Sequence, residues 1–183
     1  MGIYFDTRRE AHFFADGDDH AATLYHEAVH QLFQESQKAA RNIGGTANFW
    51  AIEGVALYFE SLTQHDHPLL GSYFTIGEAT AGRFPAARRR VADDEFFVPL
   101  AELVAMDQSA IQRSPHIAPL YSQSAGLATY FMHGESGQRR EPLIRYLQAV
   151  YSGRDDAQSL TRLTGKSYAE LDAAYRLFVQ TGR

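Results

Sequence analysis

The sequence predicts an α+β domain that is predominantly helical, with a small strand element at its N-terminal end. Two short apolar and aromatic runs, at 3–5 and 11–14, are separated by the polar link 6–10, whose length suits a hairpin. Most later apolar residues recur at the spacing that places them on one face of a helix. With 183 residues, 45% hydrophobic and 13% aromatic, we expect one domain over residues 1–183 with a substantial core. The abrupt start, with strand-like residues from position 3, also fits a piece of a longer protein.

Composition narrows the classes of function. A net charge of −5 and a pI near 5.9 give no electrostatic argument for nucleic acid or an anionic membrane as partner. No run approaches 18 apolar residues, and no basic segment followed by an apolar run marks a signal peptide. The absence of cysteine excludes disulfides and thiolate metal sites within this sequence. Localisation and oligomeric state stay undetermined.

The first helix is expected after the turn and N-cap residues at 16–19, where acidic groups suit the helix dipole. A straight helix running to Asn42 would rise about 18 Å past His30, and the chain would then have to return. We therefore expect the helix to end between 35 and 40 and the chain to turn at Gly44–Gly45. Its core-facing positions are Ala22, Tyr25, Val29, Leu32 and Phe33.

The segment HEAVH at 26–30 lies within this helix. Residues four apart share a face, so His26 and His30 can bind one metal ion, for which zinc is the natural candidate. Glu27 would project beside the metal, where it can take a proton from a bound water. The alternative is a solvated helix with two surface histidines. The pattern favours metal-assisted hydrolysis.

A second helix is expected from a cap at Asn48 through about Thr63. Glu53 is the candidate third ligand, because a carboxylate in apolar surroundings usually needs a cation and a catalytic zinc typically has three protein ligands. Gly54 costs about 1 kcal/mol in a helix, which close helix packing would explain. Glu60, on the same face as Glu53, can orient a ligand histidine or instead pair with a surface arginine.

Residues 64–98 are less informative. His65-Asp66-His67 is interpreted as a polar loop in preference to a second metal site. Residues 71–82 are expected to form an irregular loop with one short extended piece. Arg88-Arg89-Arg90 is read as a solvated helix face, with a substrate carboxylate as the alternative partner. Pro99 is expected to open a helix at its first position.

The C-terminal half is expected to be helical. Residues 119–133 form one predicted helix, and further helices follow from Glu141. Gly165 is expected to end a short helix, and Ser167 with Glu170 matches a capping box that opens the last one. The predicted core stripe of the helix after 141 consists of Ile144, Leu147 and Tyr151.

Two segments, HEAVHQ and WAIEGVALYFE, resemble the gluzincin metallopeptidases, whose third ligand is a glutamate on the next helix. The spacing of 22 residues between His30 and Glu53 is closest to the peptidase MA-like families, many of which are domains of unknown function. The segment LTGKSYAEL near the C-terminus is similar to the tail of the same families. The resemblance implies a zincin-like fold and one zinc ion, with His26, His30 and Glu53 as ligands and Glu27 as general base.

In the peptidase MA-like relatives a helix of the form Tyr-x-Gln-Ser follows the metal helices, with its tyrosine near the zinc. This resemblance implies that Tyr121 donates its hydroxyl to the oxyanion formed when water attacks a carbonyl, an interaction worth roughly 2.7–4 kcal/mol in other enzymes. A buried tyrosine bonded to a backbone carbonyl is the alternative, and His116 is a weaker substitute.

The function expected from these residues is zinc-dependent hydrolysis, with peptide or protein as substrate and esters or other amides still open. Gluzincins usually lay the substrate along a sheet edge upstream of HExxH, and only 25 residues precede the motif here. The alternatives are a zinc-retaining binding or structural domain without turnover, and a chance motif in a metal-free domain. Glu27 argues against the first, because a structural site needs no base.

Overall fold

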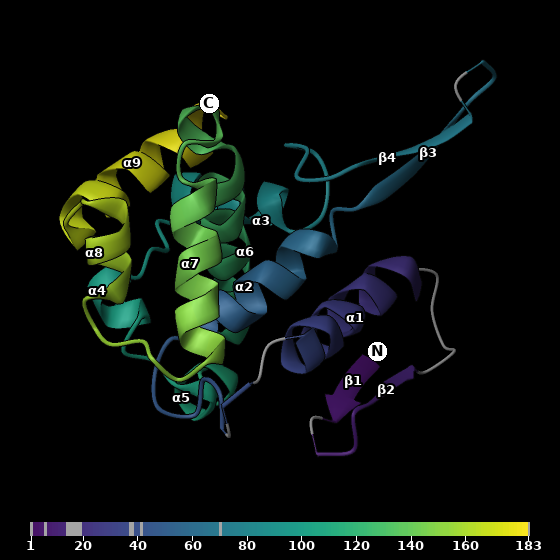
Figure 1. The fold of residues 1–183 in the computed structure, drawn as a ribbon. Coiled ribbons are helices and arrows are strands. Elements are labelled where there is room, and N and C mark those ends of the chain that lie inside the picture. Colours follow the sequence, from purple (N-terminus) through teal and green to yellow (C-terminus); the bar gives the residue numbers. More distant parts are fainter. Residues whose placement is uncertain are drawn as a thin grey trace.

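The chain folds into helices accompanied by two small two-stranded sheets (Figure 1), so the prediction of a predominantly helical α+β protein is confirmed. The computed structural model describes residues 2–5, 7–13, 20–36, 39–40, 42–69 and 71–182. Its helices are α1 (His20–Ser36), α2 (Phe49–Phe59), α3 (Phe84–Ala92), α4 (Leu100–Leu103), α5 (Gln108–Gln112), α6 (Ile117–His133), α7 (Arg140–Tyr151), α8 (Ser159–Thr164) and α9 (Tyr168–Thr181), with a 3-10 turn at Gly134–Gly137.

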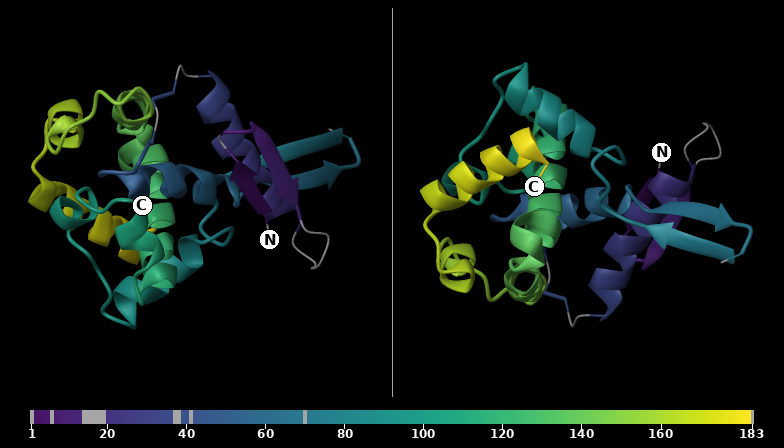
Figure 2. Two further views of the ribbon diagram at one scale, coloured as in Figure 1. Left: turned by 90° about the horizontal axis from the view of Figure 1, so that it is seen from below. Right: turned by 90° about the horizontal axis from the view of Figure 1, so that it is seen from above.

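The predicted N-terminal hairpin is present and lies against the helix that carries HEAVH. Strands β1 (Gly2–Phe5) and β2 (Glu10–Phe13) pair antiparallel, and both contact α1 (Figures 1 and 2). The expected N-cap at 16–19 falls outside the described residues. Helix α1 ends at Ser36, within the predicted window, so the chain can turn at 42–44 and return to the metal-binding face as α2.

Helix α2 is shorter than predicted, since it ends at Phe59 and not near Thr63. The side chain of Ser61 explains the difference. Its hydroxyl donates to the Tyr58 carbonyl at 2.6 Å and accepts from the Gly77 backbone N–H at 2.8 Å. The Tyr58 carbonyl at the end of the helix therefore has a side-chain donor, and Thr63 begins a strand.

The expectation of a polar loop at His65-Asp66-His67 was wrong, because these residues lie in a strand, whereas the short extended piece expected within 71–82 is present at its start. Strands β3 (Thr63–His67) and β4 (Gly71–Thr75) form a second hairpin that projects from the helical body (Figures 1 and 2). His65 stacks on Tyr73 across the strands at 5.1 Å and contacts the Thr75 hydroxyl at 2.8 Å. Most side chains of the hairpin are exposed, so the sequence carries no alternation of buried and exposed positions.

The core surrounds α2, which is buried along nearly its whole length and packs closely on α6. Gly54 permits this contact, because a Cβ at that position would lie 2.6 Å from the Ser124 carbonyl oxygen of α6. Close packing therefore does account for the helical glycine. Pro99 is the N-cap of α4 and not its first residue, while the capping box of α9 is present as predicted. No described helix is long and apolar enough to cross a bilayer.

Candidate metal centre

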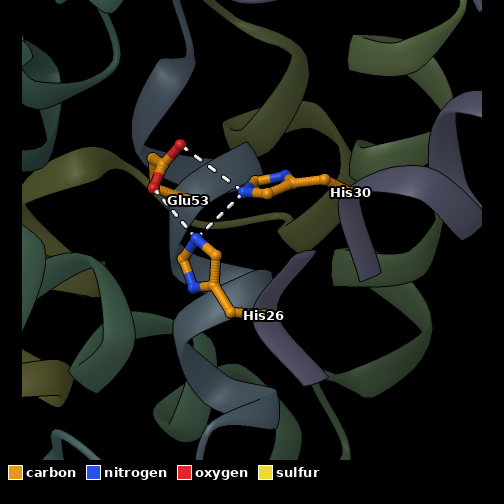
Figure 3. A group of neighbouring side chains, drawn as sticks. All are labelled: His26, His30 and Glu53. Atoms are coloured by element: carbon orange, nitrogen blue, oxygen red, sulfur yellow. Dashed lines mark hydrogen bonds and ion pairs between the residues drawn. The ribbon is translucent and has the colours of Figure 1, made fainter. Parts of the chain in front are cut away.

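Three side chains converge where α1 crosses α2. The Nε2 atoms of His26 and His30 lie 3.1 Å apart, and each is 3.7 Å from a different carboxylate oxygen of Glu53 (Figure 3). The helical spacing of four residues brings the two imidazoles together, and the turn at 42–44 brings Glu53 opposite them. These residues form a group that can hold a metal ion.

The donor set and its dimensions suit zinc. Four ligands at about 2.0–2.1 Å from a tetrahedral zinc lie about 3.3 Å from one another, since the edge of a tetrahedron is about 1.63 times its radius. The observed separations of 3.1, 3.7 and 3.7 Å bracket that value. Two imidazole nitrogens and one carboxylate oxygen also leave a fourth position open, as catalytic zinc sites do.

Burial raises the electrostatic cost of charging these three side chains. It lowers the pKa of His30 to about 3, with the nearby charge of His26 acting in the same direction. Burial also raises the pKa of Glu53 to about 7, although His26 opposes this. For His26, burial alone would lower the pKa, but the contact with Glu60 and the negative charges of the surrounding glutamates raise it above its ordinary value. A cation would relieve the cost of keeping Glu53 ionised.

Glu60 makes both contacts that the sequence left as alternatives. One carboxylate oxygen lies 3.0 Å from Nδ1 of His26. The other accepts a hydrogen bond from Nε of Arg83 at 2.8 Å. The two contacts together hold the pKa of Glu60 below its ordinary value, although burial opposes them.

Glu27 is buried beside the ligands and is fixed from the N-terminal strand. The backbone N–H of Tyr4 bonds its carboxylate, and a Cβ at Gly2 would lie 2.7 Å from its Cγ. Burial raises the pKa of Glu27, against the effect of His26. A carboxylate with a raised pKa beside a metal site is suited to accept and return a proton.

Tyr121 also reaches the centre. Its hydroxyl bonds Glu53 and the side chain of Gln112, and burial together with the charge of Glu53 raises its pKa to about 12. The hydroxyl therefore stays protonated and can donate. His116 lies exposed at the start of α6 with its ring 5.6 Å from that of Phe96, and it does not line the cleft described next.

A cleft of about 620 Å³ opens on the ligands, with β1, α1, α5 and the ends of α6 and α7 among its walls. The wall includes Tyr151, which sequence reasoning placed only in a core stripe. Its side chain is buried, its hydroxyl has no hydrogen-bond partner among the described residues, and its pKa is raised by burial and by the charge of Glu53. No pattern in the sequence distinguishes this tyrosine from a packing residue.

Residues 20–154, about three quarters of the chain, match the model of a family described as a protein of unknown function, DUF1570. The chain belongs to the DUF1570 family. The DUF1570 match contains His26, His30, Glu53, Glu60 and Tyr121. Neither the curated proteins nor the solved structures include a significant match.

Proposed function

We propose that the protein is a zinc-dependent hydrolase, with peptides as its substrates and a gluzincin-type, zincin-like site. The observation that carries the proposal is the position of Glu27, buried beside the His26, His30 and Glu53 group in one cleft. A site that only retained metal would have no use for an unliganded buried carboxylate at this place.

The chemistry divides among the residues of the cleft. Zinc held by His26, His30 and Glu53 would acidify a water molecule and polarise a substrate carbonyl. Glu27 accepts the proton of the attacking water and returns it to the leaving amine. Tyr121 donates its hydroxyl to the oxygen of the carbonyl under attack, where negative charge develops.

Peptide substrates are favoured by the strand at the cleft. Gly2, Ile3 and Tyr4 of β1 line it, and among the described strands β1 pairs with β2 alone, although the Tyr4 N–H already bonds Glu27. An extended peptide can add to the edge of a strand through main-chain hydrogen bonds. The short N-terminal segment thus supplies an edge of the kind that gluzincins use.

One observation favours the second candidate, a zinc-retaining binding domain without turnover. The hydroxyl of Tyr121 is already bonded to Glu53 and to Gln112, so it must exchange a partner before it can contact a substrate. In a domain without turnover, Tyr121 would simply keep its hydrogen bonds to Glu53 and Gln112.

The test is digestion of a diverse peptide library by zinc-loaded protein, read by mass spectrometry. Three proteins are compared: the wild type, Glu27→Gln, and the control Glu35→Gln, which changes an exposed glutamate on the same helix. We expect cleavage by the wild type and by Glu35→Gln, and a loss of at least about 100-fold in Glu27→Gln. Zinc content near one equivalent in all three proteins would show that Glu27→Gln loses the cleavage step and not the metal.

Two results would overturn the proposal. If all three proteins hold zinc and none cuts any peptide, the binding domain becomes the better account. If protein purified without added metal binds zinc no better than a variant lacking both histidines, the metal centre itself is refuted.

A further inference from the structure

The loop between β4 and α3 returns to the end of α2 beside the metal ligands. Gly77 donates to Ser61, and Gly82 lies so close that a Cβ there would be 2.9 Å from the Ser61 Cβ. Gly82 also has φ of +57°, a conformation that favours glycine. The residue that follows is Arg83, and this packing fixes where its side chain begins.

The guanidinium of Arg83 reaches Glu60 through two nitrogens. Nε donates to one carboxylate oxygen at 2.8 Å, and Nη2 donates to the other at 3.4 Å. The side chain of Glu60 is only 13% exposed, whereas that of Arg83 is 43% exposed. A carboxylate this buried is costly to keep charged without a cation, so Arg83 does more for Glu60 than an arginine in a fully exposed pair would.

Glu60 in turn lies within ion-pair distance of His26, with one carboxylate oxygen 3.0 Å from Nδ1, although the two groups are not aligned as a hydrogen bond. When Nδ1 carries the proton, as the nearby carboxylate favours, Nε2 is free of its proton and faces the metal position. The contacts therefore form a continuous chain of three residues, from the solvent-facing guanidinium through the carboxylate to the imidazole.

We propose that Arg83 is a positioning residue of the metal centre, which acts by holding the Glu60 carboxylate in place and aimed at His26. The inference rests on the metal-binding part of the proposed function. Without Arg83, nothing would hold the Glu60 side chain in this orientation, and once it turned toward water Nδ1 of His26 would lose its partner. Arg83 contributes no ligand and is not among the residues that line the cleft.

The experiment measures zinc affinity by competition with a fluorescent chelator. Loss of a group that orients a metal-binding histidine typically weakens binding 10- to 100-fold, and we expect about 10-fold for Arg83→Gln. Arg83→Lys should recover part of the loss, because it keeps the charge. The control is Arg162→Gln, whose guanidinium contacts Asp156 at 2.9 and 3.0 Å on the exposed surface near α8, away from the site (Figure 1).

A second measurement separates positioning from a general effect on folding. Long-range ¹H–¹⁵N spectra of the histidines, recorded with and without zinc, show which nitrogen of His26 carries the proton. With zinc, or without it at a pH high enough to keep His26 neutral, we expect Nδ1–H in the wild type and a changed pattern in Arg83→Gln. Thermal unfolding of the two metal-free proteins should agree within a few degrees. In a Glu60→Gln background, Arg83→Gln should weaken zinc binding no further, because its partner has lost its charge.

Unchanged zinc affinity in Arg83→Gln, or equal losses in the two backgrounds, would overturn the role of Arg83 and leave the hydrolase proposal standing. Absence of zinc binding by the wild type would instead refute the proposed function. The imidazole spectra of the metal-free proteins would then still show whether Arg83 controls His26.

Discussion

Gly54→Ala tests whether the packing of α2 on α6 sets the position of the adjacent candidate ligand Glu53. Alanine in a helix is favoured over glycine by about 0.8–1.0 kcal/mol, so the change would stabilise an unobstructed helix. Here the new Cβ would lie 2.6 Å from the Ser124 carbonyl oxygen and 3.1 Å from its carbon. Both atoms belong to the backbone, so the helices must separate, and such overpacking costs typically about 1–3 kcal/mol.

The contact at 2.6 Å places the cost in the upper part of that range, which leaves a net loss of about 1–2 kcal/mol. For a chain of this size the midpoint of thermal unfolding should fall by about 2–8 °C. Calorimetry of the metal-free protein measures this midpoint. Ala173→Gly, on the exposed face of α9, serves as the control, because it reports the effect of helix propensity alone. Zinc affinity should fall as well, because Glu53 moves with α2. A rise of the midpoint in Gly54→Ala would refute the reasoning.

Three further predictions concern buried polar groups. Zinc affinity should fall by about 10-fold per pH unit just below pH 7, because Glu53, whose pKa burial raises to about 7, then holds a proton that zinc must displace. The slope should steepen where His26, whose pKa is also raised, holds a second proton. Calorimetric titration at several pH values measures the slope, and a flat profile would contradict the prediction. Tyr151→Phe should leave the metal-free protein as stable or up to about 1 kcal/mol more stable, since the buried hydroxyl has no partner among the described residues. Tyr58→Phe should instead lose about 1 kcal/mol of stability, because it removes the 2.9 Å hydrogen bond to His133. Denaturant unfolding compares the two variants, and equal losses would show that the Tyr151 hydroxyl is hydrogen-bonded. Asn48→Ala should cost about 3 kcal/mol in the same assay, because the buried amide hydrogen-bonds two side chains and the backbone of Asn48 has φ of 60°. Asn48→Gly should cost less, because glycine adopts this φ readily. The reverse order of the two losses would contradict the prediction.

The metal-binding group was predictable because its signals are local. His26 and His30 stand one helical turn apart, and Glu53 is a charged residue within an apolar run, so each stands out without knowledge of the fold. The chain then turns at 42–44, close to the predicted Gly44–Gly45. The same locality explains why the N-terminal hairpin and the last capping box were predicted.

The contacts that support the ligands were harder to predict, because they join residues far apart in the chain. Arg83 lies 23 residues after Glu60, in a segment whose charges suggest only a solvated surface. Tyr151 has the spacing of a packing residue, and only the convergence of α7 on the cleft gives it a polar environment. The hairpin of β3 and β4 escaped prediction because exposure on both faces leaves no periodic signal.

The contact between β1 and Glu27, the proposed general base, has a practical consequence for recombinant work. Gly2 lines the cleft and packs against Glu27, so a segment fused ahead of Gly2 would be attached beside the candidate site. An affinity tag fused at that end, especially one rich in histidine, would compete for the metal and obstruct the substrate. A tag after α9 emerges on the opposite side of the fold, and assays of zinc content and cleavage should use that arrangement.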